Sequence, residues 1–337
     1  IEKFGPPDQR GSLWTRPGNF VGNGPFSLTE WQLFKRVIVE KNPHYWDAEN
    51  VSLNAIHFYP TENITTEERM FRSGQLHRTA TVPIDKLAVY RREHPELLHT
   101  YPYLGNYFYR INTEMPHLSD KRVRRALAMS IDRDAIVQQV TKGDELPAYT
   151  FTPPDTLGYT APDGFTYDPD RARALMAEAG YPGGEDFPVT ELLFNTSEGH
   201  HKIAVAIQQM WYKELGIKVN LHNQDWKVFL NSVNGGNYGI ARAGWIGDYV
   251  DPNTFLDMWI TDGGNNRTGW SSARFDQLIL EEAPRAETRE QRYRLMREAE
   301  ALLLEDMPII PIHIYTSKSL VNPAVKGLEP NILDYTL

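Results

Sequence analysis

The chain has 337 residues, of which 41% are hydrophobic, so it is long enough to bury a large core and to form two lobes. Its formal net charge is −9 and no dense run of lysine or arginine occurs, which argues against nucleic acid or an anionic membrane as the main partner. The absence of cysteine excludes disulfides, thiolate metal sites and cysteine nucleophiles, and no apolar run is long enough to span a bilayer.

The N-terminal part of the sequence predicts turns and short strands, and the pattern then becomes helical. Residues 34–42 and 53–60 alternate between apolar and polar side chains, which predicts a pair of antiparallel strands. The next helix is predicted to start with Ser119 as its N-cap. Asp132 is expected to cap a second helix, and Asp168, which is followed by a proline, is expected to cap a third.

The middle of the sequence predicts three strands that alternate with two helices. The strands are TELLFN, IKVNLHN and YGIARAGW, at 190–195, 217–223 and 238–245. One helix is expected near 200–215, and Asp225 is expected to cap the other. Because β-α-β-α-β is the unit of an open layer with right-handed crossovers, the sequence predicts an α/β fold.

A long helix and a final apolar strand are predicted near the C-terminus. Thr288 and Gln291 have the spacing of a capping box at the start of a helix that covers 288–306. The segment PIIPIHIY (308–315) has the composition of a strand, and Pro311 indicates a sheet edge or a crossing between lobes.

All three strands of the α/β layer run into polar or aromatic residues. The segments are NTSEGH (195–200), NQDW (223–226) and RAGWIGD (242–248). Parallel strands end at one rim of a sheet, and ligands of open α/β sheets bind at that rim. We therefore expect a ligand site there, with Asn195 among its hydrogen-bonding groups and Asp248 as its carboxylate.

Simpler roles stay open for several of these side chains. Asp225 is most simply a helix cap, and Asn195 and Asp248 have the preferences of turn residues. Trp226 and Trp245 are equally compatible with ordinary core rings.

The sequence offers little support for catalysis, a cofactor or a metal. It has no GxSxG, HExxH or phosphate-loop motif, so no catalytic residue and no cofactor are assigned. His200 and His201 would point apart on a helix and lack a third ligand, so no metal site is expected. A carboxylate pair of the kind that hydrolyses glycosides stays open.

Several segments, spread in order over nearly the whole chain, together have the pattern of one family. They are IEKFG, WTRPGNFVGNGPFSL, VIVEKNPHYWD, RVRRALAMSIDRDAIV, LLFNTSEGHHKIA, NQDWKVFL, ARAGWIGDYVDPNTFLDMW and IIPIHIY. With them the sequence resembles the periplasmic oligopeptide-binding proteins of ABC importers, a family of extracellular solute-binding proteins that includes dipeptide and murein-peptide receptors.

The resemblance implies a two-lobed, type II periplasmic-binding-protein fold that closes over a buried peptide. Residues 1–103 and 315–337 would belong to the first lobe, and residues 104–314 would form the second, α/β lobe. In the family a signal peptide, opening strands and a small extra domain precede this point. We therefore expect a chain truncated at its N-terminus, the C-terminal two-thirds of such a protein, that binds peptide more weakly than the complete one.

The resemblance also implies which residues line the cleft. Asp248 matches the aspartate that pairs with a ligand's N-terminal ammonium, and Arg242 and His200 match positions that meet its C-terminal carboxylate. Further matches line the peptide and its side-chain pockets, namely Gly244, Trp245, Trp226, Leu230 and Tyr315. Val233 departs from the family, which often has an arginine there, and this leaves ligand length open.

The implied function is a non-enzymatic receptor that captures short peptides and delivers them to the transmembrane subunits of an ABC permease. It would be a monomer that binds no nucleic acid. It would be periplasmic or otherwise extracytoplasmic, with lipid anchoring left open and the signal peptide absent from this sequence. A receptor for murein tripeptide, a nickel chelate or haem is the alternative within the same class, and a glycan-processing enzyme is the alternative outside it.

Overall fold

The computed structural model describes residue 5, residues 13–329 and residues 331–333. The segment IEKFG, one of those that carry the family resemblance, therefore lies outside the described residues apart from Gly5. The chain divides into two compact units, residues 1–79 and residues 80–337, and each is described by itself. The lobe boundaries implied at 103/104 and 314/315 stay a prediction.

In its described residues, the first unit contains a three-stranded antiparallel sheet and one α-helix. Its elements are β1 (Phe26–Gln32), β2 (Arg36–Lys41), β3 (Ala55–Phe58) and α1 (Ile64–Arg72), with short 3₁₀ turns at Leu13–Thr15 and Ala48–Asn50. β2 pairs with both β1 and β3, which confirms the antiparallel strands predicted for 34–42 and 53–60. The Asn63 side chain caps α1 by accepting a hydrogen bond from the Thr66 amide.

The second unit is built on a six-stranded sheet with the order β5-β9-β4-β8-β6-β7. The strands are β4 (Leu98–Ile111), β5 (Leu146–Pro147), β6 (Thr190–Asn195), β7 (Val219–Gln224), β8 (Ile240–Ile246) and β9 (Ile309–Leu320). β6 runs parallel to both β7 and β8, whereas β4 pairs antiparallel with β8 and β9. The predicted β-α-β-α-β unit and the α/β class are therefore confirmed.

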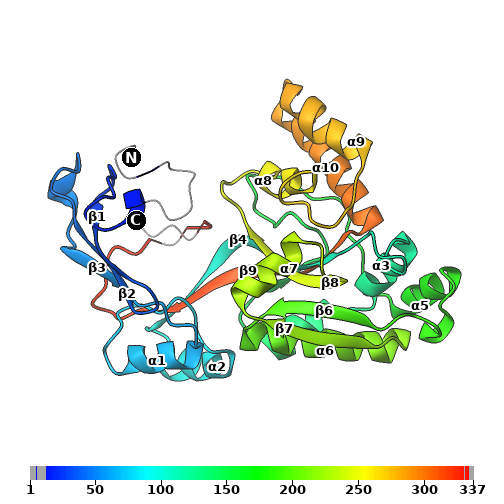
Figure 1. Ribbon diagram of the computed structural model, residues 1–337, viewed down its shortest axis with the longest axis horizontal. Coiled ribbons are helices and arrows are strands. Elements are labelled where there is room, and N and C mark those ends of the chain that lie inside the picture. Colours follow the sequence, from blue (N-terminus) through cyan, green and yellow to red (C-terminus); the bar gives the residue numbers. More distant parts are fainter. Residues whose placement is uncertain (1–4, 6–12, 330, 334–337) are drawn as a thin grey trace. The chain divides into compact units, whose positions relative to one another are not determined.

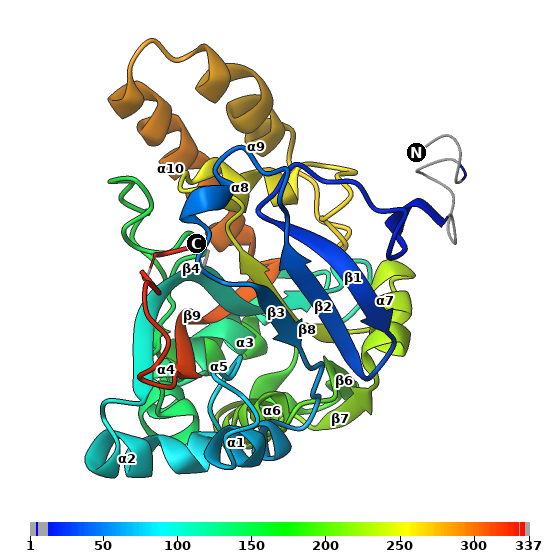
Figure 2. The same cartoon turned by 90° about the vertical axis from the view of Figure 1, so that its left-hand side faces the viewer.

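Helices cover both faces of this sheet (Figures 1 and 2). The α-helices are α2 (Ile84–Glu93), α3 (Lys121–Met129), α4 (Arg133–Ala135), α5 (Pro169–Glu178), α6 (Glu198–Leu215), α7 (Trp226–Asn234), α8 (Asn253–Leu256), α9 (Ala273–Gln277) and α10 (Arg289–Asp306). Shorter helical segments of 3₁₀ or π type lie at Ile136–Thr141, Pro182–Gly184, Asp257–Trp259, Leu278–Glu282 and Ala283–Arg285.

Most of the predicted helix caps are present. Asp132, Asp168 and Asp225 each accept a hydrogen bond from a backbone amide in the first turn of their helix. The prediction for Ser119 was wrong because the helix begins one residue later. Asp120 caps it by accepting from the Arg122 amide, while the Ser119 hydroxyl donates to a carbonyl before the helix.

The capping box of α10 is only partly formed. The Thr288 hydroxyl accepts a hydrogen bond from the Gln291 amide at 3.1 Å, as the spacing predicts. The Gln291 side chain accepts in return from the Glu287 amide at 3.2 Å, one residue before the cap.

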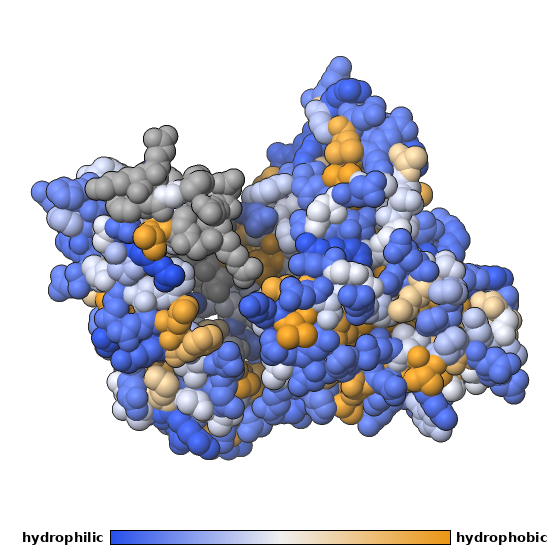
Figure 3. All heavy atoms as spheres, viewed as in Figure 1, coloured by the Kyte–Doolittle hydropathy of each residue, from blue (hydrophilic) through white to orange (hydrophobic). Residues whose placement is uncertain are grey.

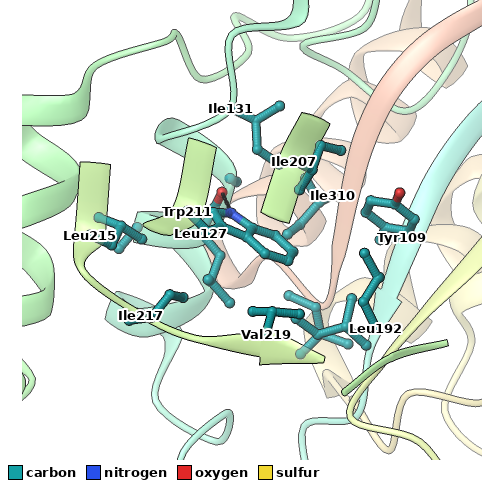
Figure 4. Packing of buried hydrophobic residues seen from close by; sticks show 14 of the residues in the cluster. Tyr109, Leu127, Ile131, Leu192, Ile207, Trp211, Leu215, Ile217, Val219 and Ile310 are labelled. Atoms are coloured by element: carbon teal, nitrogen blue, oxygen red, sulfur yellow. Dashed lines mark hydrogen bonds between the residues drawn. The ribbon is translucent and has the colours of Figure 1, made fainter. Parts of the chain in front are cut away.

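One face of the sheet packs on α3, α5 and α6. Trp211 of α6 is buried there, and its indole N–H donates to the Leu127 carbonyl at 2.9 Å, so the ring is satisfied in the core (Figure 4). This face receives the alternate residues Tyr107, Tyr109 and Ile111 of β4. The stripe of α6 that packs against it consists of Ile203, Ile207, Trp211 and Leu215, which are all buried.

The opposite face packs on α8, α9, α10 and, beside them, α7. Phe108 of β4 and Ala243 of β8 point to this side, together with buried residues of α9 and α10. Leu193 and Ala241 meet Phe229 and Val233 of α7 on the same side. Because side chains alternate along a strand, neighbouring residues of β4 and of β8 point to opposite faces of the sheet.

The outer surface is mostly hydrophilic on the face in view, with apolar residues in small separate groups (Figure 3). Among the described residues, no helix is both long enough and apolar enough to cross a membrane.

Candidate ligand-binding site

The rim predicted from the sequence exists. Asn195 ends β6 and lies opposite Gln224, which ends the parallel neighbour β7, and β8 runs parallel to β6 and continues past this level to Ile246. The carbonyl oxygens of the Asn195 and Gln224 side chains are buried and have no hydrogen-bond partner among the described residues. Buried polar oxygens that lack a partner are costly, so these two atoms are available to a hydrogen-bond donor from a ligand.

A second group lies where β8, β4 and β9 run side by side (Figures 1 and 2). Tyr107 in the central strand is paired with Gly244 of β8 and with His313 of β9. Residues directly opposite each other on paired strands share a face of the sheet. The three residues therefore form a row on the face that also packs against α6.

A β-bulge sets the register of this row. Tyr107 pairs with His313, but the next residue, Phe108, pairs with Pro311, so Ile312 is the extra residue of β9. Proline lacks an amide hydrogen and is tolerated at such an irregularity. Pro311 thus marks a bulge. In the strand order β9 lies between β5 and β4, but β5 pairs only with His313 and Ile314. Pro311 therefore has a paired neighbour on the β4 side alone, which agrees with the sheet-edge alternative from the sequence.

Arg242 projects into this group from β8. Its Nη2 donates a hydrogen bond to the Tyr315 hydroxyl at 2.7 Å, and its guanidinium carbon lies 4.8 Å from the centre of the Tyr107 ring. Its Nε is buried without a hydrogen-bond partner, and no described carboxylate forms an ion pair with it. Burial lowers the pKa of Arg242, but the phenols of Tyr315 and Tyr107 outweigh burial and raise it, so the side chain stays charged.

Gly244 makes this arrangement possible. A Cβ atom at this position would collide with the Tyr315 hydroxyl and would lie 3.2 Å from Nη2 of Arg242. Any side chain at residue 244 would therefore displace the hydrogen-bonded pair.

His200 reaches the same group from the first turn of α6. Its ring centre lies 5.5 Å from that of Tyr107. Burial, followed by the charges of Arg242 and His313, lowers the pKa of His200 to about 2, so its imidazole is neutral at physiological pH. The adjacent His201 is exposed and faces Phe194 instead, as expected for neighbours on a helix.

The carboxylate of the predicted site lies in the turn after β8. Asp248 is exposed, and its backbone amide donates to the Thr254 hydroxyl at 3.1 Å. The Trp245 indole N–H donates to the Thr254 carbonyl at 2.6 Å, and the ring is partly buried against the core under α8 to α10. Burial and the neighbouring Asp248 raise the pKa of Asp257, which follows α8.

The structure places two predicted pocket residues on α7. Trp226 is 56% exposed and stacks on Phe229, so the core-ring alternative does not hold for it, and its place at a ligand pocket stays a prediction. Leu230 is partly buried against the small cluster on the opposite face of the sheet from Arg242. Val233, the departure from the family pattern, is buried in that cluster and faces the core.

The structure thus brings together Arg242, Gly244, His200 and Tyr315, and it adds two residues that the sequence did not indicate. Tyr107 is one of several tyrosines in a strand, and His313 is a single histidine in an apolar run. Neither has a spacing that links it to the site. Only the register of β4 with β8 and β9 places them there.

Comparison with known proteins gives a consistent set of relatives. A family model described as bacterial extracellular solute-binding proteins, family 5 middle, matches residues 3–267. The periplasmic oligopeptide-binding protein OppA of Salmonella typhimurium is 38% identical over 335 residues, 97% of this chain and 60% of that protein. The periplasmic murein peptide-binding protein MppA of Escherichia coli is 36% identical over 329 residues, 96% of this chain and 61% of that protein.

Solved structures agree. A periplasmic oligopeptide-binding protein from Borrelia burgdorferi superposes with a TM-score of 0.89 at 33% identity and covers 96% of this chain and 65% of its own. Haemophilus influenzae OppA, in complex with the peptide RPPGFSPFR, gives a TM-score of 0.86 at 30% identity and covers 97% and 64%. The chain therefore spans about 60% of the length of the curated relatives cited above.

Proposed function

The chain belongs to family 5 of the bacterial extracellular solute-binding proteins, and from this premise we propose that it forms the main ligand-binding part of a short-peptide receptor. The receptor would serve an ABC importer and hand the peptide to the transmembrane permease subunits. The relatives are named as binding proteins for oligopeptides and murein peptide, so a murein peptide is a second ligand to test.

The observation that carries the proposal is the state of Arg242. The Arg242 guanidinium is partly buried, with its Nε fully buried, and it is held by phenols instead of a carboxylate, so its partly desolvated charge lacks a counter-ion. The carboxylate of a peptide C-terminus has the charge and the two-oxygen geometry that an arginine binds best. The neutral His200 beside it would add one further hydrogen bond without adding charge.

The other end of a peptide carries an ammonium group, and Asp248 would receive it. An N⁺–H···O⁻ hydrogen bond contributes about 1.5–3 kcal/mol once water is excluded. Asn195, Gly244, Trp245, Trp226 and Leu230 would line the space around the guest. Backbone hydrogen bonds to the end of β8 would then hold the peptide main chain, as in strand addition, which explains tolerance of many side chains.

The remaining parts of the proposal follow from the family. The receptor would lie outside the cytoplasm, as the periplasmic relatives do, and would act as a monomer. Two lobes, divided at about residues 103/104 and 314/315, would close over the ligand by hinging. The relatives are binding proteins, so we propose capture without chemical change.

Isothermal calorimetry with a series of three- to five-residue peptides tests this function. Free peptides are compared with N-acetylated and C-amidated forms of the same sequence, and the ligand is recovered afterwards for mass spectrometry. We expect stoichiometric binding of the free peptide, weaker binding of both blocked forms, and an unchanged ligand. Absence of binding, or hydrolysis of a peptide or glycan, would overturn the proposal.

A further inference from the structure

Tyr107 lies at the centre of the group that surrounds Arg242. Its ring centre is 5.5 Å from that of His200, 4.9 Å from that of His313 and 6.2 Å from that of Tyr315. The guanidinium carbon of Arg242 lies 4.8 Å from the same ring. Only 1% of Tyr107 is exposed, so its ring is part of the core and not a surface that a ligand covers.

The contact between Tyr107 and Arg242 has the geometry of a cation–π interaction. A guanidinium within about 6 Å of a tyrosine ring centre is attracted by the ring quadrupole, and the attraction grows when water is excluded. The ring leaves the charge in place, whereas a carboxylate partner would neutralise it. Tyr107 can therefore hold the cation while leaving it able to bind an anion.

His313 fixes the ring of Tyr107 from the other side. The two rings are stacked, with an interplanar angle of 18°, and His313 also meets the Tyr315 ring edge to face at 5.3 Å and 89°. The rings of Tyr107 and Tyr315, which both lie beside Arg242, are therefore both in contact with the His313 imidazole. The bulge at Ile312 sets the register that brings His313 opposite Tyr107.

An ion pair lies behind His313. The carboxylate of Glu145 forms a buried ion pair with Lys318 and also accepts hydrogen bonds from the Thr141 hydroxyl at 2.8 Å and the Gly143 amide at 2.9 Å. The charge of Lys318, which lies near His313, is therefore already balanced by Glu145, whereas Arg242 forms no ion pair with a described carboxylate.

We propose that Tyr107, supported by His313, is a positioning residue that holds Arg242 and His200 in place for the carboxylate of a bound peptide. The inference rests on the proposed function, since it names how the carboxylate end of that site is built. Tyr107 itself touches no ligand. Its effect reaches the ligand through the orientation of the guanidinium and the imidazole.

The first test needs no ligand. The Nε–H signal of Arg242, assigned with Arg242→Met, is measured by NMR in the chain and in Tyr107→Phe and Tyr107→Leu. We expect a ring-current shift in the parent chain, little change in Tyr107→Phe, which keeps a ring, and loss of the shift in Tyr107→Leu. A signal that Tyr107→Leu leaves unchanged would show that the ring does not hold the guanidinium.

The second test measures peptide affinity in the same variants. Tyr107→Leu is expected to weaken a free-acid peptide about tenfold, the middle of the cation–π range, and to leave its C-amidated form nearly unchanged. The effect should disappear when Arg242→Met is already present. Equal losses for both peptides would overturn the positioning role and leave Tyr107 only a core residue.

Phe108→Leu is the matched control. Phe108 is the next residue of β4, is equally buried, and points to the opposite face of the sheet. It should lower thermal stability without changing the ratio of free-acid to amide affinity, and a changed ratio would mean that β4 packing alone sets the selectivity. If the parent chain shows the NMR shift but binds no peptide, the proposed function is wrong, although the contact between Tyr107 and Arg242 exists.

Discussion

The two charged ends of the candidate site are built in different ways. Arg242 lies in the sheet among Tyr107, Tyr315 and His200, with its Nε buried and no acidic partner among the described residues. Asp248 lies in an exposed turn, near the carboxylate of Asp257, which follows α8. A buried charge depends on many fixed neighbours, whereas an exposed charge needs only its local turn. We therefore expect the cationic end to dominate affinity and to be the easier end to damage.

The largest effect is expected when the buried charge is removed. Arg242→Met should weaken a free-acid peptide by about 2–5 kcal/mol, the range found for one partner of a buried charged pair, and should hardly affect the C-amidated peptide. Calorimetry with both peptides gives the two affinities. If Arg242→Met weakens the C-amidated peptide as much as the free-acid peptide, Arg242 does not bind the carboxylate, and the contrast between the two ends of the site is wrong.

A smaller effect is expected at the exposed end. Asp248→Asn should weaken peptides with a free N-terminus by about 1.5–3 kcal/mol, because a neutral amide accepts a weaker hydrogen bond from an ammonium group. N-acetylated peptides should be nearly unaffected when measured in the same titrations. If Asp248→Asn lowers the affinity for the free peptide more than Arg242→Met does, the anionic end, and not the cationic end, contributes more to affinity.

Gly244→Ala tests whether the packing of the cationic end matters apart from its charge. The added methyl group would collide with the Tyr315 hydroxyl and crowd Arg242, so unfolding free energy should fall by about 1–3 kcal/mol. Chemical denaturation measures this fall, and the preference for free-acid peptides should decrease with it. Gly264→Ala is the matched control, because nothing lies within 4 Å of a Cβ there, and stability should stay the same.

The last prediction concerns the acid sensitivity of folding. Burial lowers the pKa of His200 to about 2 and that of His313 to about 4, below the ordinary value of 6.5. Between about pH 6.5 and 4 the unfolded chain therefore binds more protons than the folded chain, and stability falls as the pH falls. Each histidine contributes at most about 1.4 kcal/mol per pH unit.

His200→Gln and His313→Gln should each flatten the dependence of unfolding free energy on pH between 7 and 5. Denaturation curves at pH 7, 6 and 5 measure the slope. His201→Gln provides the control, since this neighbouring histidine is exposed. An equal slope in all four proteins would show that the two buried histidines do not couple folding to pH.

Local sequence signals predicted the parts of the fold that local forces decide. Aspartates followed by helical periods marked the starts of α4, α5 and α7, and the side chains of Asp132, Asp168 and Asp225 do cap them. The prediction for Ser119 was wrong because the adjacent Asp120 is equally able to cap, and the Asp120 side chain is the one that accepts from the Arg122 amide. The sequence left open whether Trp226 is a core ring, because burial is a property of the assembled layers, and the structure shows that this ring is exposed.

By itself, the sequence determined the β-α-β-α-β unit, the common rim of its parallel strands and the residue types gathered on that rim. Only the tertiary structure decided that Tyr107 and His313 stand beside Arg242, since strand register and the bulge at Ile312 join segments far apart in the chain. Periodicity reports which face of an element is apolar, but it contains no record of which strands become neighbours. The surroundings of a buried charge depend on that pairing.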